Sequence, residues 1–216
     1  MRSILERSNR LIDVPLDTAP RVLLLVAALL LVPTYFLPLW KLTMFAPQYP
    51  TGLKLDIYSY KLQGGHQGQD INEINILNHY IGMKDLTTAD FTEFKWMPFV
   101  IGMLGLLFLR ALVRGRMGDL LDVLMLYVYF GLFSLGSFAY KLYSYGHNLS
   151  PTASVKVDPF MPPLFGHRKL ANFEVYSFPA AAAYALTAVL LVLLMASFLS
   201  WRDARREERE EARSAG

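Results

Sequence analysis

The sequence contains no cysteine, and this absence excludes several kinds of site. Disulfide bonds, thiolate-bound zinc, iron–sulfur clusters and covalently attached haem all need cysteine side chains. The absence says little about the compartment in which the protein resides. Any metal site in this chain has to use histidine, methionine or oxygen ligands.

Histidine is also scarce, and none of the four lies in an apolar block: His66, His79, His147 and His167. A transmembrane haem b needs axial ligands such as histidine inside a helix bundle, so a cytochrome b-type role is not expected. The apolar blocks contain no lysine or glutamate, and their only acidic residues are Asp119 and Asp122, at the start of the third block. An ion pathway usually needs buried ionisable groups, so the helices are interpreted as an anchor and scaffold.

Apolar residues are abundant, at 54% of the chain, and they are grouped in blocks. A block of about 20 apolar residues matches the hydrocarbon core of a bilayer, where the backbone must be helical to satisfy its polar groups. The sequence therefore predicts an all-α membrane protein, a bundle of four transmembrane helices. The predicted spans are residues 21–39, 96–112, 119–140 and 178–199. No Ala-x-Ala site follows the first block, so we expect a retained helix, with a cleaved signal peptide as the alternative.

Arginine predicts the orientation of these spans. Of 13 arginines, 12 lie before or at the start of the first span, in the short middle loop or in the C-terminal tail, and only Arg168 lies elsewhere. The positive-inside rule places both termini in the cytoplasm and residues 41–95 and 141–177 outside. This predicts a multi-pass protein of the bacterial inner membrane with two periplasmic segments. The basic residues flank apolar blocks, so the pI near 9.0 does not indicate nucleic-acid binding.

The two outer segments have different local patterns. Residues 53–60 alternate as a strand does, and Asp70 followed by Glu73 resembles a capping box for a short amphipathic helix that ends near Gly82. Four prolines between residues 151 and 163 disfavour a long helix in the second segment. Because one short helix is marginal alone, we expect the two segments to fold together as a small cap on the bundle.

Soft metal ligands occur in both outer segments. His79 and Met83 are four residues apart and could share one face of the predicted helix, and imidazole with thioether suits copper(I). The alternative is that both side chains pack or hydrogen-bond at the membrane surface. The candidate metal ligands are His79, Met83, His147, Met161 and His167. His66 lies in a Gly/Gln-rich loop and is expected to be exposed.

Three strings of the sequence resemble a known family: 77–83 (LNHYIGM), 145–149 (YGHNL) and 161–164 (MPPL). They are similar to strings in small bacterial membrane proteins encoded beside the maturation genes of nitrous oxide reductase, a periplasmic copper enzyme. The resemblance implies a non-catalytic accessory role in the maturation of such an enzyme or in its copper supply. The implied partners are the lipid bilayer and a periplasmic copper protein or membrane maturation complex. The residues expected to contact a partner are Asn78, Asn148, Pro162 and Pro163.

The chain departs from the family pattern just after its second string. The pattern continues with Asp-Pro-His, whereas this chain has Ser150, Pro151 and Thr152. A histidine ligand at the third of these positions is absent, so docking is favoured over direct copper binding. A second hypothesis is a structural subunit of a membrane transporter or electron-transfer complex. The sequence shows no nucleophile–base–oxyanion arrangement, and no enzymatic activity is expected.

Overall fold

The computed structural model describes residues 13–170 and 173–214, and these divide into two compact units. Of the described residues, the helical unit comprises 13–32, 100–131 and 185–214. The sheet unit comprises residues 33–99 and 132–184. Each unit is described by itself below.

Within the described residues, four helices are long and apolar enough to span a membrane, as the sequence predicts, so the chain is a multi-pass membrane protein. They belong to α2 (Thr18–Leu30), α4 (Glu93–Arg114), α5 (Met117–His147) and α6 (Ala181–Ser214). The apolar stretches are Thr18–Tyr35, Glu93–Arg114, Met117–His147 and Ala181–Arg206. The first includes the 3-10 helix η1 (Val32–Tyr35). Pro33 lies in η1, just after α2, where a residue without a backbone N–H ends the α-helix.

The helical unit holds its helices together through a few specific contacts. The ring of Phe108 on α4 lies 5.9 Å from the ring of Tyr127 on α5. The Tyr127 hydroxyl donates a hydrogen bond of 2.7 Å to the carbonyl oxygen of Leu186 on α6. A buried hydroxyl in apolar surroundings is costly unless it is hydrogen-bonded, and this bond satisfies it. Leu31 packs near Gly105, which brings the end of α2 against α4.

The helices differ from the predicted spans at two ends. The predicted span 119–140 lies within α5, which has 31 residues and continues to His147. The predicted start of the fourth span at residue 178 is wrong, because Phe173–Pro179 is a strand and α6 begins at Ala181. In both cases the outer segment has more regular structure than its prolines suggested.

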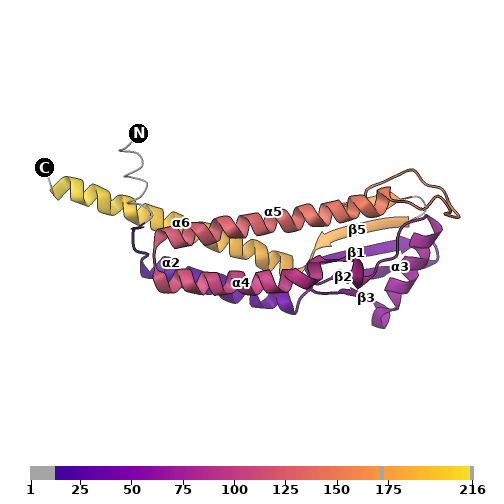
Figure 1. Ribbon diagram of the computed structural model, residues 1–216, viewed down its shortest axis with the longest axis horizontal. Coiled ribbons are helices and arrows are strands. Elements are labelled where there is room, and N and C mark those ends of the chain that lie inside the picture. The colour runs from indigo at the N-terminus through magenta and orange to yellow at the C-terminus, as the bar shows by residue number, and fades with distance from the viewer. Residues whose placement is uncertain (1–12, 171–172, 215–216) are drawn as a thin grey trace. The chain divides into compact units, whose positions relative to one another are not determined.

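The all-α prediction is also wrong, because the sheet unit contains a five-stranded antiparallel sheet of order β3-β2-β1-β5-β4 (Figure 1). Only the stretch 53–60 was expected to be extended, and the strand there begins earlier and ends at Ile57. The strands are β1 (Trp40–Ala46), β2 (Tyr49–Ile57), β3 (Leu62–Gly64), β4 (Gly166–Leu170) and β5 (Phe173–Pro179).

The pairing of β1 with β5 joins the two outer segments. The register runs from Trp40 opposite Pro179 to Phe45 opposite Glu174. The Trp40 indole also donates a hydrogen bond of 2.8 Å to the hydroxyl of Ser177, across the same pair of strands. The expectation that the two segments fold together is therefore confirmed. The hydrogen-bonded pair of β1 and β5 joins them in one sheet.

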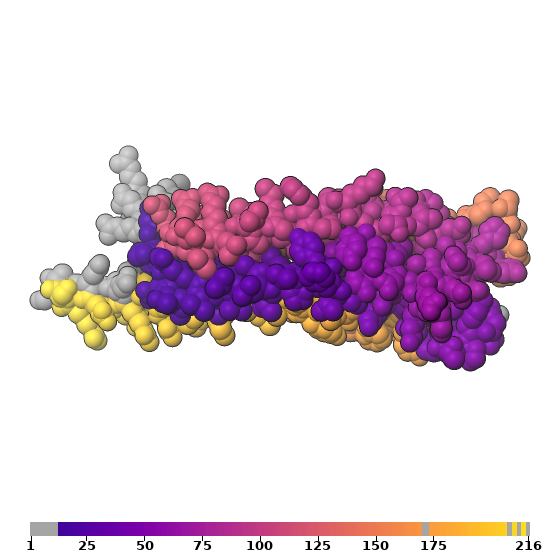
Figure 2. All heavy atoms as spheres, turned by 90° about the horizontal axis from the view of Figure 1, so that it is seen from below, coloured from indigo at the N-terminus to yellow at the C-terminus, as the bar shows by residue number. Residues whose placement is uncertain are grey.

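Helix α3 (Gln69–Tyr80) covers part of this sheet and closes its core. Ile74 and Leu77 are buried against Leu55 of β2 and Val175 of β5. Each such side chain contributes roughly 1.5–3 kcal/mol when fully buried. The space-filling view shows the first segment, coloured purple, over most of the visible face of the sheet unit (Figure 2).

The predicted capping box does not form at the start of α3. The helix follows the short 3-10 turn η2 (His66–Gly68), and no side chain caps it. The carboxylate of Asp70 instead accepts the backbone N–H of Lys54 at 2.8 Å and lies 2.7 Å from Nδ1 of His66. Asp70 therefore ties α3 to strand β2 instead of closing its own helix.

Candidate functional site

An apolar cavity of about 80 Å³ lies inside the sheet unit. Its walls come from β1, β2 and β5, from α3, from the last turns of α5 and from residues 160–162. Most of the lining is aliphatic or aromatic, and it includes Leu42, Leu55, Ile74, Phe91, Leu142 and Phe173. An empty cavity of this size costs ~2 kcal/mol of folding free energy by its volume. An apolar group bound in the cavity would remove that cost.

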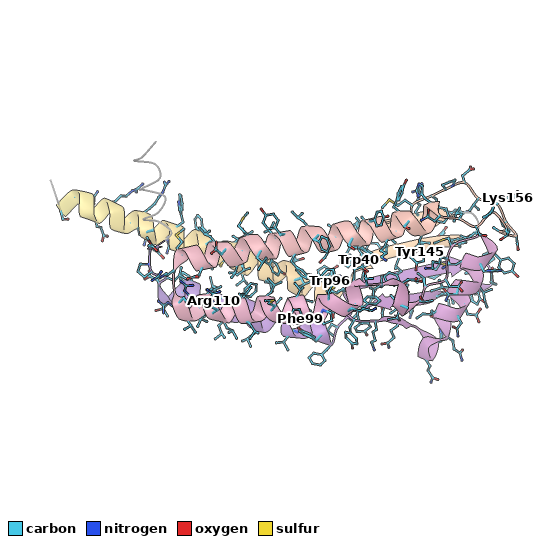
Figure 3. The ribbon with its side chains drawn as sticks, in the orientation of Figure 1. Trp40, Trp96, Phe99, Arg110, Tyr145 and Lys156 are labelled. Carbon is cyan, nitrogen blue, oxygen red and sulfur yellow. The ribbon has the colours of Figure 1, made fainter. Side chains whose placement is uncertain are left out.

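One face of α5 forms a wall of the cavity. Phe138, Lys141, Leu142 and Tyr145 line it, at the i, i+3, i+4, i+7 spacing that puts side chains on one side of a helix. Figure 3 shows Tyr145 on the part of α5 that runs beside the sheet. A bilayer core needs about 20 helical residues. Because α5 has 31 residues, its last turns are free to serve as the wall of a site.

The chain after α5 passes over this wall at Gly146. The backbone N–H of Phe160 donates a hydrogen bond of 3.0 Å to the carbonyl oxygen of Gly146. A Cβ atom at residue 146 would overlap the carbonyl oxygen of Phe160, so only glycine permits this approach. The crossing brings Phe160 and Pro162 into the cavity lining.

A second, polar hollow of about 430 Å³ adjoins the cavity. Met83, Lys141 and Tyr145 line both spaces, so they stand where the apolar lining gives way to the polar one. The remaining residues around the hollow are Gly82, Lys84, Asp90, Ser144, Asn148, Leu149 and Ser150. Together the two spaces have the composition of a small-molecule site, with an apolar interior and a few polar groups at one end.

Lys141 is held at the boundary between the two spaces by acceptors near the start of α4. Its ammonium group donates a hydrogen bond of 2.7 Å to the carbonyl oxygen of Asp90 and lies 3.9 Å from Oε2 of Glu93. The Ser137 hydroxyl donates to the other oxygen of Glu93 at 2.5 Å. The lysine is thus positioned by α4 while its side chain remains part of the hollow.

Asp90 at the end of the 3-10 turn η3 (Thr88–Asp90) carries the negative charge of the hollow. Lys84 lies 2.5 Å from its Oδ1, and the Thr87 hydroxyl donates to its Oδ2 at 2.8 Å. These two hydrogen bonds, with Lys84 the stronger, hold the pKa of Asp90 below its ordinary value. Asp90 is therefore ionised across the physiological range, and the hollow carries two lysines against one carboxylate.

Gly82 makes the turn that brings the first outer segment to this hollow. Its φ of +77° is in the left-handed region that favours glycine. The backbone N–H of Met83 then bonds to the carbonyl oxygen of Asn78 at 2.9 Å, and the Gly82 carbonyl accepts the N–H of Ser150 at 2.7 Å. The turn thus both ends α3 and binds the second segment.

This turn separates the two residues expected to form a helical metal pair. Helix α3 ends at Tyr80, so His79 and Met83 do not share a helical face, and that expectation is wrong. The His79 side chain is exposed, whereas Met83 is half-buried and lines the cavity and the hollow. Met83 is the one of these two that belongs to the candidate site.

The other three metal candidates have local partners. The His147 ring stacks on Tyr143 with centroids 3.8 Å apart, and the His167 ring stacks on Tyr176 at 5.0 Å. The carbonyl oxygen of Met161 accepts a hydrogen bond from Arg168. Within residues 13–170 and 173–214, no group of three or more His, Cys, Asp or Glu side chains is placed to hold a metal ion. Copper(I) coordination that includes methionine stays a prediction.

The four expected partner contacts differ in exposure. Asn148 is exposed and lines the hollow. Asn78, Pro162 and Pro163 are buried, so these three side chains do not face a partner in this structure. Asn78 and Pro162 line the apolar cavity instead. In this structure Asn78 and Pro162 are therefore wall residues of an interior space.

Sequence reasoning missed Lys141, Tyr145 and Asp90 as site residues. From the sequence, an aromatic residue such as Tyr145 at the end of an apolar block is typical of the aromatic belt of a membrane protein. One signal was present: Lys141 is a lone cation within a helical stretch that otherwise reads as an apolar face. The three family-like strings are far apart in sequence, yet each contributes to the cavity or the hollow, through Met83, Tyr145 and Pro162.

Comparison with known proteins identified no relative: no family model, no curated protein and no solved structure matches the chain.

Proposed function

We propose that this chain is a non-catalytic accessory protein of the bacterial inner membrane, which acts from its periplasmic sheet unit on the maturation or copper supply of a copper enzyme of the nitrous oxide reductase type. One observation carries the proposal. The three strings that resemble the accessory family, 77–83, 145–149 and 161–164, converge on one cavity and its polar hollow. These strings lie in different structural elements, so their convergence on one space is what a shared binding site would require.

The geometry favours partner or ligand handling over a closed copper site. Met83 is the one thioether of the candidate ligands that lines the hollow, while His79 and His167 are exposed elsewhere on the unit. A copper(I) site needs several soft ligands within bonding distance. Met83 together with Asn148 is therefore proposed as the place where the sheet unit meets a periplasmic copper protein or its cargo.

Gene deletion in a nitrous-oxide-respiring bacterium tests this function. We expect nitrous oxide reductase activity per enzyme to fall, with enzyme abundance little changed. Complementation with Met83→Leu should restore less activity than complementation with Met125→Leu, a matched control because Met125 is an exposed residue of α5 in the helical unit. Unchanged reductase activity in the deletion strain would overturn the proposal.

The alternative role of a structural subunit rests on a different observation. Ile76, Tyr80 and Val155 are each about half exposed, and a backbone hydrogen bond of 2.9 Å from Val155 to Tyr80 brings the two outer segments together there. Exposed apolar side chains that gather in one place are typical of interaction surfaces. Co-purification of a stable membrane complex that is lost in Tyr80→Ser with Ile76→Ser, but kept in Met83→Leu, would favour this alternative.

A further inference from the structure

The cavity and the hollow that adjoins it differ in chemistry. The inner space is lined by hydrocarbon from β1, β2, β5 and α3, whereas the outer hollow carries ammonium, hydroxyl, amide and carboxylate groups. A uniformly apolar ligand would leave the polar end unused, and a uniformly polar ligand would leave the cavity empty. The two spaces together fit a molecule that has one apolar end and one polar end.

The volumes limit the apolar end. The inner space of about 80 Å³ is small, so it has room for a short apolar end only. A water molecule in the apolar space would find few hydrogen-bond partners, so hydrocarbon is the better occupant. The hollow of about 430 Å³ accommodates the rest of the ligand.

The N–H donors of the lysines select the polar end. Each lysine already has one carboxylate partner: Lys84 lies 2.5 Å from Asp90, and Lys141 lies 3.9 Å from Glu93. The distance from Lys141 to Glu93 is too long for a hydrogen bond, and Lys141 donates one N–H to the carbonyl oxygen of Asp90. Because an ammonium group has three N–H donors, Lys141 keeps donors for a ligand. Ionised carboxylate and phosphate oxygens are the strongest acceptors for such donors, which favours an anionic head group at Lys141.

We propose that the sheet unit binds a single-chain amphiphile whose anionic head, a carboxylate or a phosphate monoester, lies at Lys141 and Lys84, and whose short apolar end fills the cavity beyond Met83 and Tyr145. This site uses the same cavity as the proposed function but does not depend on a copper enzyme. If no ligand binds, the deletion phenotype can still support the proposed function. If the deletion has no phenotype, ligand binding can still support this site.

The test uses the full chain in nanodiscs of neutral lipid, with methionine methyl groups labelled by carbon-13. Met44 and Met83 line the cavity, while Met103 and Met125 are exposed residues of the helical unit. Titration with octanoate should shift the Met44 and Met83 signals in a saturable way and leave Met103 and Met125 in place. Equal shifts at all four would show partition into the bilayer and overturn the proposal.

Head groups and variants separate the two parts of the site. Comparing the binding of octyl phosphate with that of octanoate distinguishes a phosphate from a carboxylate head group. Octylammonium should bind at least about tenfold more weakly than either anion, because it cannot accept a hydrogen bond from the charged lysine. Lys141→Gln and Lys84→Gln should weaken octanoate binding without changing the binding of octanol. Lys61→Gln is the matched control, because Lys61 lies over Tyr58 and Tyr60 and lines neither space.

A cavity-filling variant tests the apolar end. Leu142→Trp places added volume in the cavity from α5 and should abolish saturable binding of every probe. If Leu142→Trp fails to fold, the exposed Lys84→Gln keeps the test valid, since its side chain is largely in solvent. Binding of octanoate that is unaffected by both lysine substitutions would also contradict the proposed site.

Discussion

The carbonyl oxygen of Phe160 occupies the position that a Cβ atom on residue 146 would take, so Gly146 and Phe160 are in direct backbone contact, with a hydrogen bond of 3.0 Å between them. This contact fastens the chain after α5 to the helix that walls the cavity. Together with the hydrogen bond from Arg168 to the carbonyl oxygen of Met161, it positions Phe160 and Pro162 over the apolar space.

Gly146→Ala should therefore destabilise the sheet unit by about 1–3 kcal/mol, the usual cost of overpacking. The matched control is Gly136→Ala on the same helix, where a Cβ atom meets nothing within 4 Å. That variant should be stabilising by roughly 0.5–1 kcal/mol, because alanine loses less backbone entropy than glycine in a helix. Thermal unfolding in detergent measures both, and equal effects of the two substitutions would contradict the contact.

Gly82→Asn should be more harmful than Gly68→Asn. Both glycines have positive φ, which asparagine tolerates. A Cβ atom at residue 82 would lie 2.9 Å from the Ser150 carbonyl oxygen, whereas one at residue 68 meets nothing within 4 Å. We expect a loss of ~1–3 kcal/mol at residue 82 and a few tenths at residue 68. Faster hydrogen exchange at Ser150 in the first variant alone would identify the cause.

The Asp90 network should weaken in acid. Because the folded-state pKa of Asp90 lies below the ordinary 3.8, its contribution to stability is present above that value and is lost as the pH falls through the folded pKa. The protection factors of residues 84–91, which correct for the intrinsic pH dependence of amide exchange, should therefore fall below about pH 4. Asp90→Asn should lower these protection factors at neutral pH and remove their acid dependence. An acid transition that persists in this variant would assign it to another group.

Reporter fusions test the orientation. Fusions after residues 70, 115, 160 and 216 should report outside, inside, outside and inside, because the arginines gather before the first span, between α4 and α5 and after the last span. A periplasmic C-terminus would show that the arginine distribution does not control the topology of this chain.

The spans and the sheet were not equally accessible to sequence reasoning. The four apolar helices were predictable because hydrophobicity and length are local properties, and a bilayer selects for both within one segment. The β1–β5 pair was not, because its partners are 129 to 139 residues apart, from Phe45–Glu174 to Trp40–Pro179. The alternation within one short strand does not say which distant strand will pair with it. The helix α5 extends past the predicted span to His147, and the sequence did not reveal this because its last turns carry polar residues such as Lys141 and Ser144.

The candidate site shows the same division. Sequence alone predicted the four apolar stretches that form helices long enough to cross a membrane in the described residues, and the polar segments between the first and second and between the third and fourth. It also determined that any metal site must do without cysteine. Only the tertiary structure decided that Met83, Lys141 and Tyr145 meet at the edge of an apolar cavity and that Asn78 is a wall residue. The reason is physical: membrane spanning depends on the composition of one segment, whereas a cavity depends on which distant backbones pair, and that follows from hydrogen bonds and packing summed over the whole unit.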